Sequence, residues 1–409
     1  MECSPALARR LALTRQRLAG PQPASLMEAV RDLACLQLDP LSVVARSHLL
    51  VLFSRLGRYD PAELNRLLWD ERCLFEYWAH CASIVLTEDY PLHSVKMRRY
   101  PPRDLDSGVR IHAWVRQNDR LKRYILSELR RRGPLLSREL DELGPPPKHW
   151  VSTGWTSDRN VSRMLDYLWL SGKIMVAGRQ GIQKAWDLSE RCLPAWTPRE
   201  TLSERETAQR AALRALRALG VGTARQVQLH FMRWRNPDPK RVLAELEAEG
   251  QVQRVVIRHE GQAWPGEWFM HTADVPLLAQ LERGAWEPRT TLLSPFDNLI
   301  CDRQRTAQLF GFDFRVGIYT PRAQRQFGYY VMPILHGDRL IGRLDPELDR
   351  DRQQLTVQSV HAEADAPRTR AAGAAVARAV EDLAAFIGAR KIVYNKAKLP
   401  SAWKRDLLG

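Results

Sequence analysis

The sequence predicts a mainly helical α+β protein with several domains, because one pattern of helices followed by a β-hairpin recurs along its 409 residues. In each copy, a helix precedes a short helix-turn-helix and then two strands rich in β-branched residues. This order is typical of a winged helix-turn-helix. After the third copy, short strands alternate with Asn, Asp and Gly turns. We therefore expect three tandem winged helix-turn-helix domains, over 1–115, 116–198 and 199–284, and a C-terminal β-barrel-like domain over 285–409.

The second copy shows the pattern most clearly. Residues 119–132 place apolar side chains at helical spacing and end at a Gly-Pro pair. A helix over 136–143 follows, and its Ser137 and acidic first turns are typical of a helix start. Residues 158–171 predict a third helix, and 173–188 predict a wing of two strands around a glycine turn.

The same signals locate the other elements. In the third copy we expect helices over 204–219 and 239–250, a short helix that begins at a Thr223 cap, and a wing over 251–271. The first copy is more degraded, with helices expected at 5–19, 25–35 and near 40–56. In the last part of the chain we expect strands over 294–303, 313–320, 326–349 and 353–363. An Ala-rich helix over 368–388 and a final strand over 391–396 are expected to follow.

The charge of the chain favours a polyanionic partner. Lys and Arg number 62 against 47 Asp and Glu, which gives a formal charge of +15. This excess favours nucleic acid first and an anionic membrane second. No apolar run reaches the roughly 18 residues that span a bilayer, and arginines interrupt the apolar face of the first helix. A mitochondrial transit peptide is the rival for this Arg-rich start, but Glu2 and continuous globular patterning argue against it. We expect a cytoplasmic, nucleoid-associated monomer.

No motif for a metal or cofactor is found. The six cysteines are scattered without a CxxC pair, and the ten histidines form no HExxH pattern. Glycine-rich phosphate loops of the GxxxxGK[ST] or GxGxxG type are also missing from the sequence. We therefore expect chemistry that needs no metal and no cofactor.

Gln37-Leu38-Asp39 is the most informative stretch, because it places an amide and a carboxylate inside an apolar run. In extended backbone, side chains two residues apart point to the same side, so Gln37 and Asp39 can converge on one bound water. Burying both costs free energy unless each is paired. The alternative is that Asp39 caps a helix with Pro40 at its first position, and spacing alone favours that cap.

Basic side chains around the predicted helices and wings are candidates for phosphate contacts. Each one alone is more simply a solvated surface charge, but the set favours a large duplex-binding surface whose affinity falls with salt. The set comprises Arg46, Arg159, Arg163, Lys173, Arg179, Lys184, Arg233 and Arg235, with Lys240 and Arg241. Trp150 and Trp155 flank a polar Ser-Thr-Gly segment and are candidates for a stacking platform, although core packing is the simpler reading of each tryptophan.

Four stretches carry a resemblance to a known family: residues 36–57, 74–86, 292–314 and 328–350. They resemble the winged-helix DNA glycosylases of crosslink repair, the YcaQ/AlkZ-like family. The resemblance implies a tandem winged-helix protein with a C-terminal β-domain that excises N7-alkylated purines and, in one branch, unhooks nitrogen-mustard-type interstrand crosslinks. The catalytic signature of the family is Gln, an apolar residue, then Asp or Gln. It maps onto Gln37-Leu38-Asp39, whose Asp form resembles the crosslink-unhooking branch.

The residue types suit that chemistry. N7-alkylation makes guanine cationic, so the base leaves without a general acid, and the enzyme needs to stabilise an oxocarbenium-like sugar and deliver water to C1′. A carboxylate at Asp39 can do both, and Gln37 can orient the water. The element contains no lysine for a Schiff base, so we expect a monofunctional glycosylase that leaves an abasic site. A crosslink cannot be flipped into a deep pocket, so an open, shallow, basic cleft is expected.

Further candidates for cleft contacts are Glu76, Tyr77, His80 and His48. Glu76 and His80 are spaced i, i+4 and would share a face if their segment is helical. A buried Glu–His hydrogen bond is the equal alternative, and His48 can simply pack beside the catalytic element. Asn298, Asp302 and Arg303 lie in the most family-like C-terminal stretch, and for Asp302 and Arg303 the sequence favours structural or DNA-backbone roles over catalysis.

Two other classes of function fit the winged-helix pattern. A non-catalytic DNA-binding transcriptional regulator would bind a short specific site, and a protein-interaction scaffold would show no salt-dependent DNA binding. Neither class needs the Gln-x-Asp pair, so the sequence favours the glycosylase.

Overall fold

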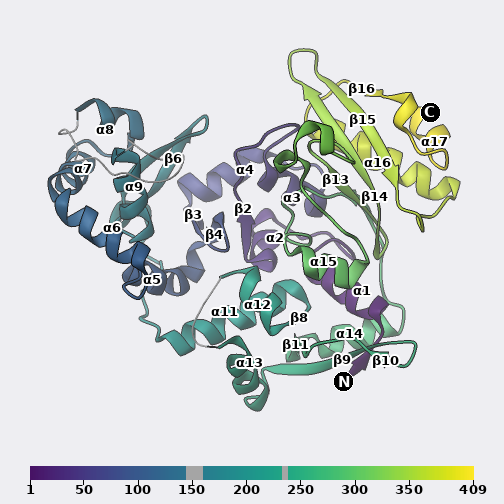
Figure 1. Cartoon of the computed structure of the whole chain (residues 1–409), viewed down its shortest axis with the longest axis horizontal. Coiled ribbons are helices and arrows are strands. Elements are labelled where there is room, and N and C mark those ends of the chain that lie inside the picture. The colour runs from purple at the N-terminus through teal and green to yellow at the C-terminus, as the bar shows by residue number, and fades with distance from the viewer. Residues whose placement is uncertain (144–159, 233–237) are drawn as a thin grey trace. The chain divides into compact units, whose positions relative to one another are not determined.

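The computed structural model describes residues 1–143, 160–232 and 238–409, which form two compact units (Figure 1). One unit joins Met1–Pro61 to Ala208–Gly409, and the other is Ala62–Thr207. Helices account for 47% of the chain and strands for 21%, which confirms a mixed and mainly helical fold. The start of the chain thus shares a unit with its C-terminal third.

The first 61 residues supply four elements beyond the short strand β1 (Glu2–Cys3). They are α1 (Pro5–Arg15), α2 (Leu26–Leu33), β2 (Cys35–Gln37) and α3 (Ser47–Leu56). Ser4 and Ser25 cap the first two helices, because their hydroxyls accept the backbone N–H groups of Leu7 and Glu28 at 3.2 and 3.1 Å. The helices predicted at 5–19 and 25–35 are confirmed in position, and both are shorter.

The middle of this unit contains a helix, a short helix, a second long helix and a hairpin. In chain order the elements are α11 (Glu204–Leu219), β8 (Val221–Thr223), α12 (Ala224–His230), α13 (Pro239–Ala248), β9 (Val252–His259), β10 (Gln262–Ala263), β11 (Trp268–His271) and α14 (Val275–Glu282). The predicted Thr223 cap is confirmed as a capping box with Gln226. The strands pair in the order β1-β9-β11-β8, and β10 pairs with β9.

The last third of the chain forms a curled half-barrel sheet (Figure 1). Its strand order is β12 (Thr290–Leu292), β13 (Met332–His336), β14 (Arg339–Asp349), β15 (Gln354–Ala362) and β16 (Lys391–Tyr394). Neighbours are antiparallel except β15 and β16, which run parallel because helix α16 (Arg370–Phe386) crosses between them. The predicted strands within 326–349 and 353–363, the Ala-rich helix and the final strand are therefore confirmed.

Two predicted strands in this region are wrong. Residues 294–303 lead into helix α15 (Arg303–Phe310), and 313–320 form loops and a short 3-10 turn. The Asp302 carboxylate begins α15 by accepting the N–H groups of Gln304 and Arg305 at 3.1 and 3.2 Å. The Asp302 cap therefore starts a helix where the apolar pattern before it predicted a strand. A short helix α17 (Lys404–Leu408) was also not predicted.

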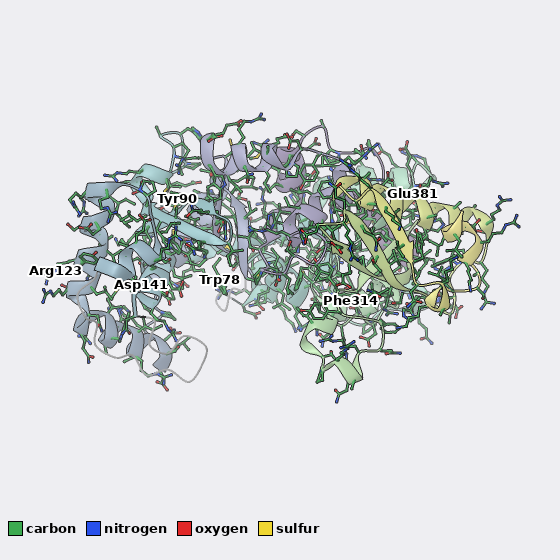
Figure 2. All side chains as sticks on the ribbon, turned by 90° about the horizontal axis from the view of Figure 1, so that it is seen from above. Trp78, Tyr90, Arg123, Asp141, Phe314 and Glu381 are labelled. Carbon is green, nitrogen blue, oxygen red and sulfur yellow. The ribbon has the colours of Figure 1, made fainter. Side chains whose placement is uncertain are left out.

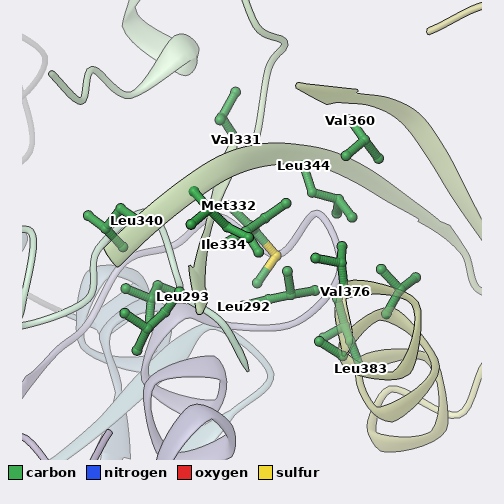
Figure 3. Close-up of a cluster of buried hydrophobic side chains, with 14 of the residues drawn as sticks. Leu292, Leu293, Val331, Met332, Ile334, Leu340, Leu344, Val360, Val376 and Leu383 are labelled. Atoms are coloured by element: carbon green, nitrogen blue, oxygen red, sulfur yellow. The ribbon is translucent and has the colours of Figure 1, made fainter. Parts of the chain in front are cut away.

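The core of the half-barrel packs against α16 (Figure 3). Leu292, Met332 and Leu344 of the strands are buried with Val376 of α16 in one cluster. Val44, Leu50 and Phe53 from the start of the chain belong to the same cluster, and the rings of Phe53 and Phe386 stack with centroids 4.8 Å apart. The sheet therefore forms a base for the segment that contains Gln37 and Asp39.

The unit Ala62–Thr207 contains mostly short elements. They are α4 (Pro61–Asn65), a π-helical turn (Arg66–Asp70), β3 (Leu74–Trp78), β4 (Ala82–Leu86), α5 (Tyr90–Arg99), α6 (Asp106–Gln117), α7 (Asp119–Arg132), β5 (Leu135–Leu136), α8 (Ser137–Leu143), α9 (Asn160–Leu170), β6 (Ile174–Gln180), β7 (Gln183–Leu188) and α10 (Ser189–Cys192). The predicted helix over 119–132 and the wing over 173–188 are confirmed. Gly181, with φ of +63°, supplies the left-handed residue of the wing turn. Within the described residues, no helix has both the length and the apolarity needed to cross a bilayer.

Candidate functional site

Gln37 and Asp39 lie at the end of strand β2 and in the loop that follows it. Helix α2 stops at Ala34, which has a positive φ of 67°, and β2 runs from Cys35 to Gln37. Cys35 and Leu36 are buried, whereas Gln37, Leu38 and Asp39 are half-buried. Both polar side chains therefore come from extended or loop backbone and lie at the border between core and solvent.

Asp39 does not cap a helix, so the reading that spacing alone favoured is wrong. Helix α3 begins only at Ser47, and the long helix expected near 40–56 is reduced to its second half. The Asp39 Oδ1 instead accepts the N–H of Leu41 at 2.9 Å, which closes a local turn typical of aspartate. The second Asp39 oxygen, Oδ2, takes no part in this turn.

Contacts with the C-terminal half explain why residues 40–46 are not helical. The Arg350 guanidinium donates to the carbonyls of Ser42 and Val44 at 3.1 and 3.3 Å, and the N–H of Leu348 donates to the Val43 carbonyl at 3.4 Å. A helix would use these carbonyls within itself. The loop is therefore held in a non-helical path by residues that are distant in sequence.

Asn298 anchors the other side of the element. Its side-chain N–H₂ donates to the carbonyls of Cys35 and Leu33 at 2.8 and 3.4 Å. The Ser47 hydroxyl also donates to the Gln37 carbonyl at 3.0 Å. These bonds fix the backbone on which the Gln37 and Asp39 side chains stand. Asn298 therefore holds the backbone of β2 in place.

A buried ion pair supports the loop that carries Asn298. The Arg55 guanidinium binds both carboxylate oxygens of Asp297, at 2.8 Å for the Nη2–Oδ1 contact, and both side chains are 0% exposed. Arg55 Nε and Nη2 also donate to the backbone and side-chain oxygens of Gln16 at 3.0 and 3.2 Å. The fully paired geometry offsets the cost of burying two charges. Neither Arg55 nor Asp297 was predicted as a site residue from the sequence. The signal that could have found them is one charged residue within each of two apolar runs.

Burial makes Asp39 a stronger base than a free aspartate. Desolvation raises the pKa of the Asp39 carboxyl above its usual value, and the hydrogen bond from the Leu41 N–H partly offsets that rise. Burial raises the pKa of the Tyr330 hydroxyl far above its usual value, and the charge of Asp39 adds to that rise. Tyr330 was missed in the sequence, because it lies among apolar residues of a predicted strand.

Glu76, Tyr77 and His80 lie in the unit Ala62–Thr207, on a β-hairpin rather than a helix. Glu76 and Tyr77 are in β3, and His80 lies in the turn before β4, so the shared helical face is wrong. Trp78 ends β3 and is 40% exposed (Figure 2). The Tyr77 hydroxyl donates to the Leu170 carbonyl at 2.8 Å, which gives it a structural role.

The partner of Glu76 is Arg179 of the wing. Glu76 is only 2% exposed and accepts both ends of the Arg179 guanidinium, at 2.7 Å for Nη2–Oε2. The Trp169 indole N–H donates to the Glu76 carbonyl at 3.1 Å. The hairpin and wing of this unit are thus joined by a bidentate ion pair, and Arg179 is occupied by it.

The other basic candidates differ in their surroundings. Lys173 is exposed, whereas Arg46, Arg163 and Lys184 are half-buried, and Arg46 precedes α3 as its N-terminal flanking residue. The Lys184 ammonium lies over the rings of Trp169 and Trp186, at 4.2 and 5.0 Å from their centroids. Lys240 and Arg241 are exposed on α13, and His48 is buried in α3. Arg159, Arg233, Arg235, Trp150 and Trp155 lie outside the described residues.

Asp302 and Arg303 stand at the start of α15, where Asp302 is the cap. In the described part of the chain, no group of three or more His, Cys, Asp or Glu side chains is arranged to hold a metal ion. The element around Asp39 offers one carboxylate and one amide on an anchored backbone.

Comparison with known proteins identifies the family of this chain. The family described as AlkZ-like DNA glycosylase matches residues 30–386, which include the Gln37–Asp39 element and strands β12 to β15 of the half-barrel sheet. Among solved structures, the chain is similar to the Streptomyces sahachiroi DNA glycosylase AlkZ, with a TM-score of 0.66 and 18% identity over 98% of this chain and 100% of that one. At that identity the structural likeness shows a shared fold. The family match over most of the chain shows that this protein belongs to the AlkZ-like family of DNA glycosylases, enzymes of DNA repair.

Proposed function

We propose that the protein is a monofunctional glycosylase that hydrolyses the N-glycosidic bond of N7-alkylated purines, including those in interstrand crosslinks, and leaves abasic sites. The observation that carries this proposal is Asp39, a half-buried carboxylate of raised pKa on a backbone anchored from both sides. The sequence identifies the same residue as the acidic member of the Gln-x-Asp signature.

In the proposed reaction, N7-alkylation has already made the purine a good leaving group, so bond cleavage develops positive charge on the sugar. The ionised Asp39 carboxylate stabilises that charge and accepts a proton from the attacking water. The Gln37 amide holds the water by hydrogen bonding. Since Cys35–Leu41 contains no lysine, no Schiff base forms in this element and the strand is left uncut.

We further propose that duplex DNA is held by repeated winged helix-turn-helix elements. The order helix, short helix, helix and hairpin in α11 to β11 supports this reading, as do the hairpin β6–β7 and the helices before it. The phosphate contacts proposed are Arg46, Arg163, Lys173 and Lys184, with Arg159, Arg233, Arg235, Lys240 and Arg241, whereas Arg179 is engaged by Glu76. Affinity that falls steeply with salt is the expected property.

The test is excision from two duplexes, one with a single N7-alkylguanine and one with a nitrogen-mustard crosslink. Asp39→Asn keeps the shape of the side chain and is expected to lower the rate by about 10²–10⁴. The matched control is Asp351→Asn, which makes the same change at an exposed position and should leave the rate unaltered. Cleavage of the monoadduct alone would narrow the activity to alkylpurine removal. Tight, salt-dependent binding without cleavage would favour the DNA-binding regulator.

A further inference from the structure

Trp78 is a large aromatic side chain that the fold leaves open to solvent. It ends β3 and is 40% exposed, whereas Trp169 and Trp186 of the same unit are 4% and 3% exposed. The residue opposite Trp78 on β4 is Ala82, whose methyl group is too small to cover an indole ring. One exposed apolar residue is ordinary on a protein surface. What distinguishes Trp78 is the set of groups around its ring.

A set of buried aromatic rings supports Trp78 on the side of the core. Its ring meets that of Trp169 edge-on, with centroids 6.5 Å apart and an interplanar angle of 71°. Trp169 in turn contacts the rings of Tyr77 and Trp186 at 5.8 and 6.1 Å, and its indole N–H donates to the Glu76 carbonyl at 3.1 Å. These contacts fix the ring on which Trp78 rests. A ring held in place before binding loses little conformational freedom when a ligand stacks on it.

Two ammonium groups lie around this aromatic cluster. The Lys96 ammonium, from α5, donates to the Trp78 carbonyl at 3.5 Å. The Lys184 ammonium lies 4.2 Å from the centroid of the ring that supports Trp78. The carboxylate of Glu76, on the same strand, is neutralised by its bidentate pair with Arg179. The exposed ring of Trp78 is thus an aromatic face with positive charge nearby.

We propose that Trp78 is a stacking platform for an unpaired nucleobase of the DNA substrate. Every base has a π-face, so stacking on tryptophan tolerates any sequence, and the ammonium groups attract the phosphates that flank the base. A glycosylase produces such a base in every reaction, because excision leaves the former partner of the lost base unpaired. Stacking at Trp78 requires DNA as the substrate, which membership of the family shows, but neither a particular lesion nor catalysis by Asp39.

The first test is binding at fixed salt to two duplexes without any alkylated base. One duplex is fully paired. The other carries a tetrahydrofuran abasic analogue, which has no base to excise and leaves the opposite base unpaired. Wild type should bind the second duplex more tightly. Loss of one stacked base lowers affinity by roughly 5- to 150-fold, so Trp78→Leu should lose that much for the abasic duplex and little for the paired one. Trp78→Phe, which keeps an aromatic face, should retain part of the preference.

Trp196→Leu is the matched control. Trp196 is 53% exposed and belongs to the same unit, but it takes part in none of the ring contacts that support Trp78. This variant should keep the wild-type preference for the abasic duplex. Melting temperatures of all three variants check that the unit remains folded.

The second test uses the wild-type protein. A 5-iodouracil placed opposite the tetrahydrofuran should crosslink to Trp78 on irradiation, because the photoreaction requires a closely stacked partner. The crosslinked peptide is identified by mass spectrometry. The same 5-iodouracil paired with adenine should give no crosslink at Trp78.

Equal losses of affinity for both duplexes in Trp78→Leu would overturn the inference, because the ring would then be a general contact. A wild type without preference for the abasic duplex, or a crosslink confined to other residues, would also overturn it. If Trp78→Leu melts below the wild type, the crosslink decides, since it needs no variant. Failure to excise N7-alkylguanine would count against the proposed function alone, because neither duplex contains that base.

Discussion

The Arg55–Asp297 pair provides the clearest quantitative test of how the site is supported. Both side chains are completely buried, and both carboxylate oxygens are bound by the guanidinium. Asp297→Ala leaves the Arg55 cation in the core with only neutral acceptors, namely the oxygens of Gln16, Val51 and Ser54. Removing one partner of a buried pair costs about 3–5 kcal/mol, most of it from the unpaired charge.

That loss would be a large fraction of the roughly 5–15 kcal/mol by which folded domains are stable. Replacing both residues, with Arg55→Met and Asp297→Leu together, removes the charge as well as the partner. The double variant should be clearly more stable than Asp297→Ala, because no buried ion remains. The sign of the difference in unfolding free energy between the double variant and Asp297→Ala distinguishes the effect of an unpaired charge from a simple loss of packing.

The assay is denaturant unfolding of wild type, the single variant and the double variant at fixed salt. Glu2→Gln is the matched control. Its pair with Arg258 measures 2.9 Å, but the side chains are 60% and 47% exposed, so the loss should not exceed about 1 kcal/mol. A loss below about 1 kcal/mol for Asp297→Ala would refute the reasoning, as would a double variant no more stable than the single one.

Three further outcomes are expected. Asn298→Ala should lower the free energy of unfolding by about 1–3 kcal/mol, because two buried carbonyls lose their donor. It should also slow excision more than it weakens DNA binding. Equal losses of rate and affinity, measured by single-turnover excision and binding titration, would contradict this. Arg179→Ala should lower the melting temperature, because the buried Glu76 carboxylate loses its partner. Lys173→Ala should leave the melting temperature unchanged and reduce the salt slope of DNA binding by about one. Equal melting temperatures of the two variants would argue against a structural role for Arg179. Burial raises the pKa values of Cys3 and Cys192 to about 11, so both thiols should resist iodoacetamide at pH 8 until the protein is unfolded, and mass spectrometry of the labelled native protein would reveal early reaction.

Local signals predicted the elements whose ends are set by their own residues. The helix over 119–132 has the predicted bounds because a Gly-Pro pair stops it, and the Thr223 cap starts α12. Such signals need no knowledge of the rest of the chain.

Distant contacts decided the elements that sequence reasoning misjudged. Residues 40–46 are kept from helical structure by Arg350 and Leu348, which no local pattern reveals. The i, i+4 spacing of Glu76 and His80 fits a helix, but the same residues span a strand and its turn, and an arginine 103 positions away engages Glu76. An i, i+4 spacing is compatible with a helix and with a strand followed by a turn, so it does not distinguish between them.

The candidate site divides in the same way. Gln37 and Asp39 were recognisable because two polar residues interrupt an apolar run. Arg55 and Asp297 were not, because a single charged residue in each of two distant apolar runs does not reveal that the two will pair. The sequence thus locates the groups proposed to react better than the residues that hold them.

The anchoring of the Asp39 loop also determines when the site can form. The Ser42 carbonyl is held by a residue 308 positions further along the chain, and the Cys35 carbonyl by one 263 positions away. Contacts of such long sequence separation form late, because the chain between them has to be ordered first. On the ribosome, a nascent chain that ends before β14 already contains Gln37 and Asp39 but lacks the backbone support that Leu348 and Arg350 supply. Hydrolytic competence would therefore be among the last properties that this polypeptide gains during synthesis.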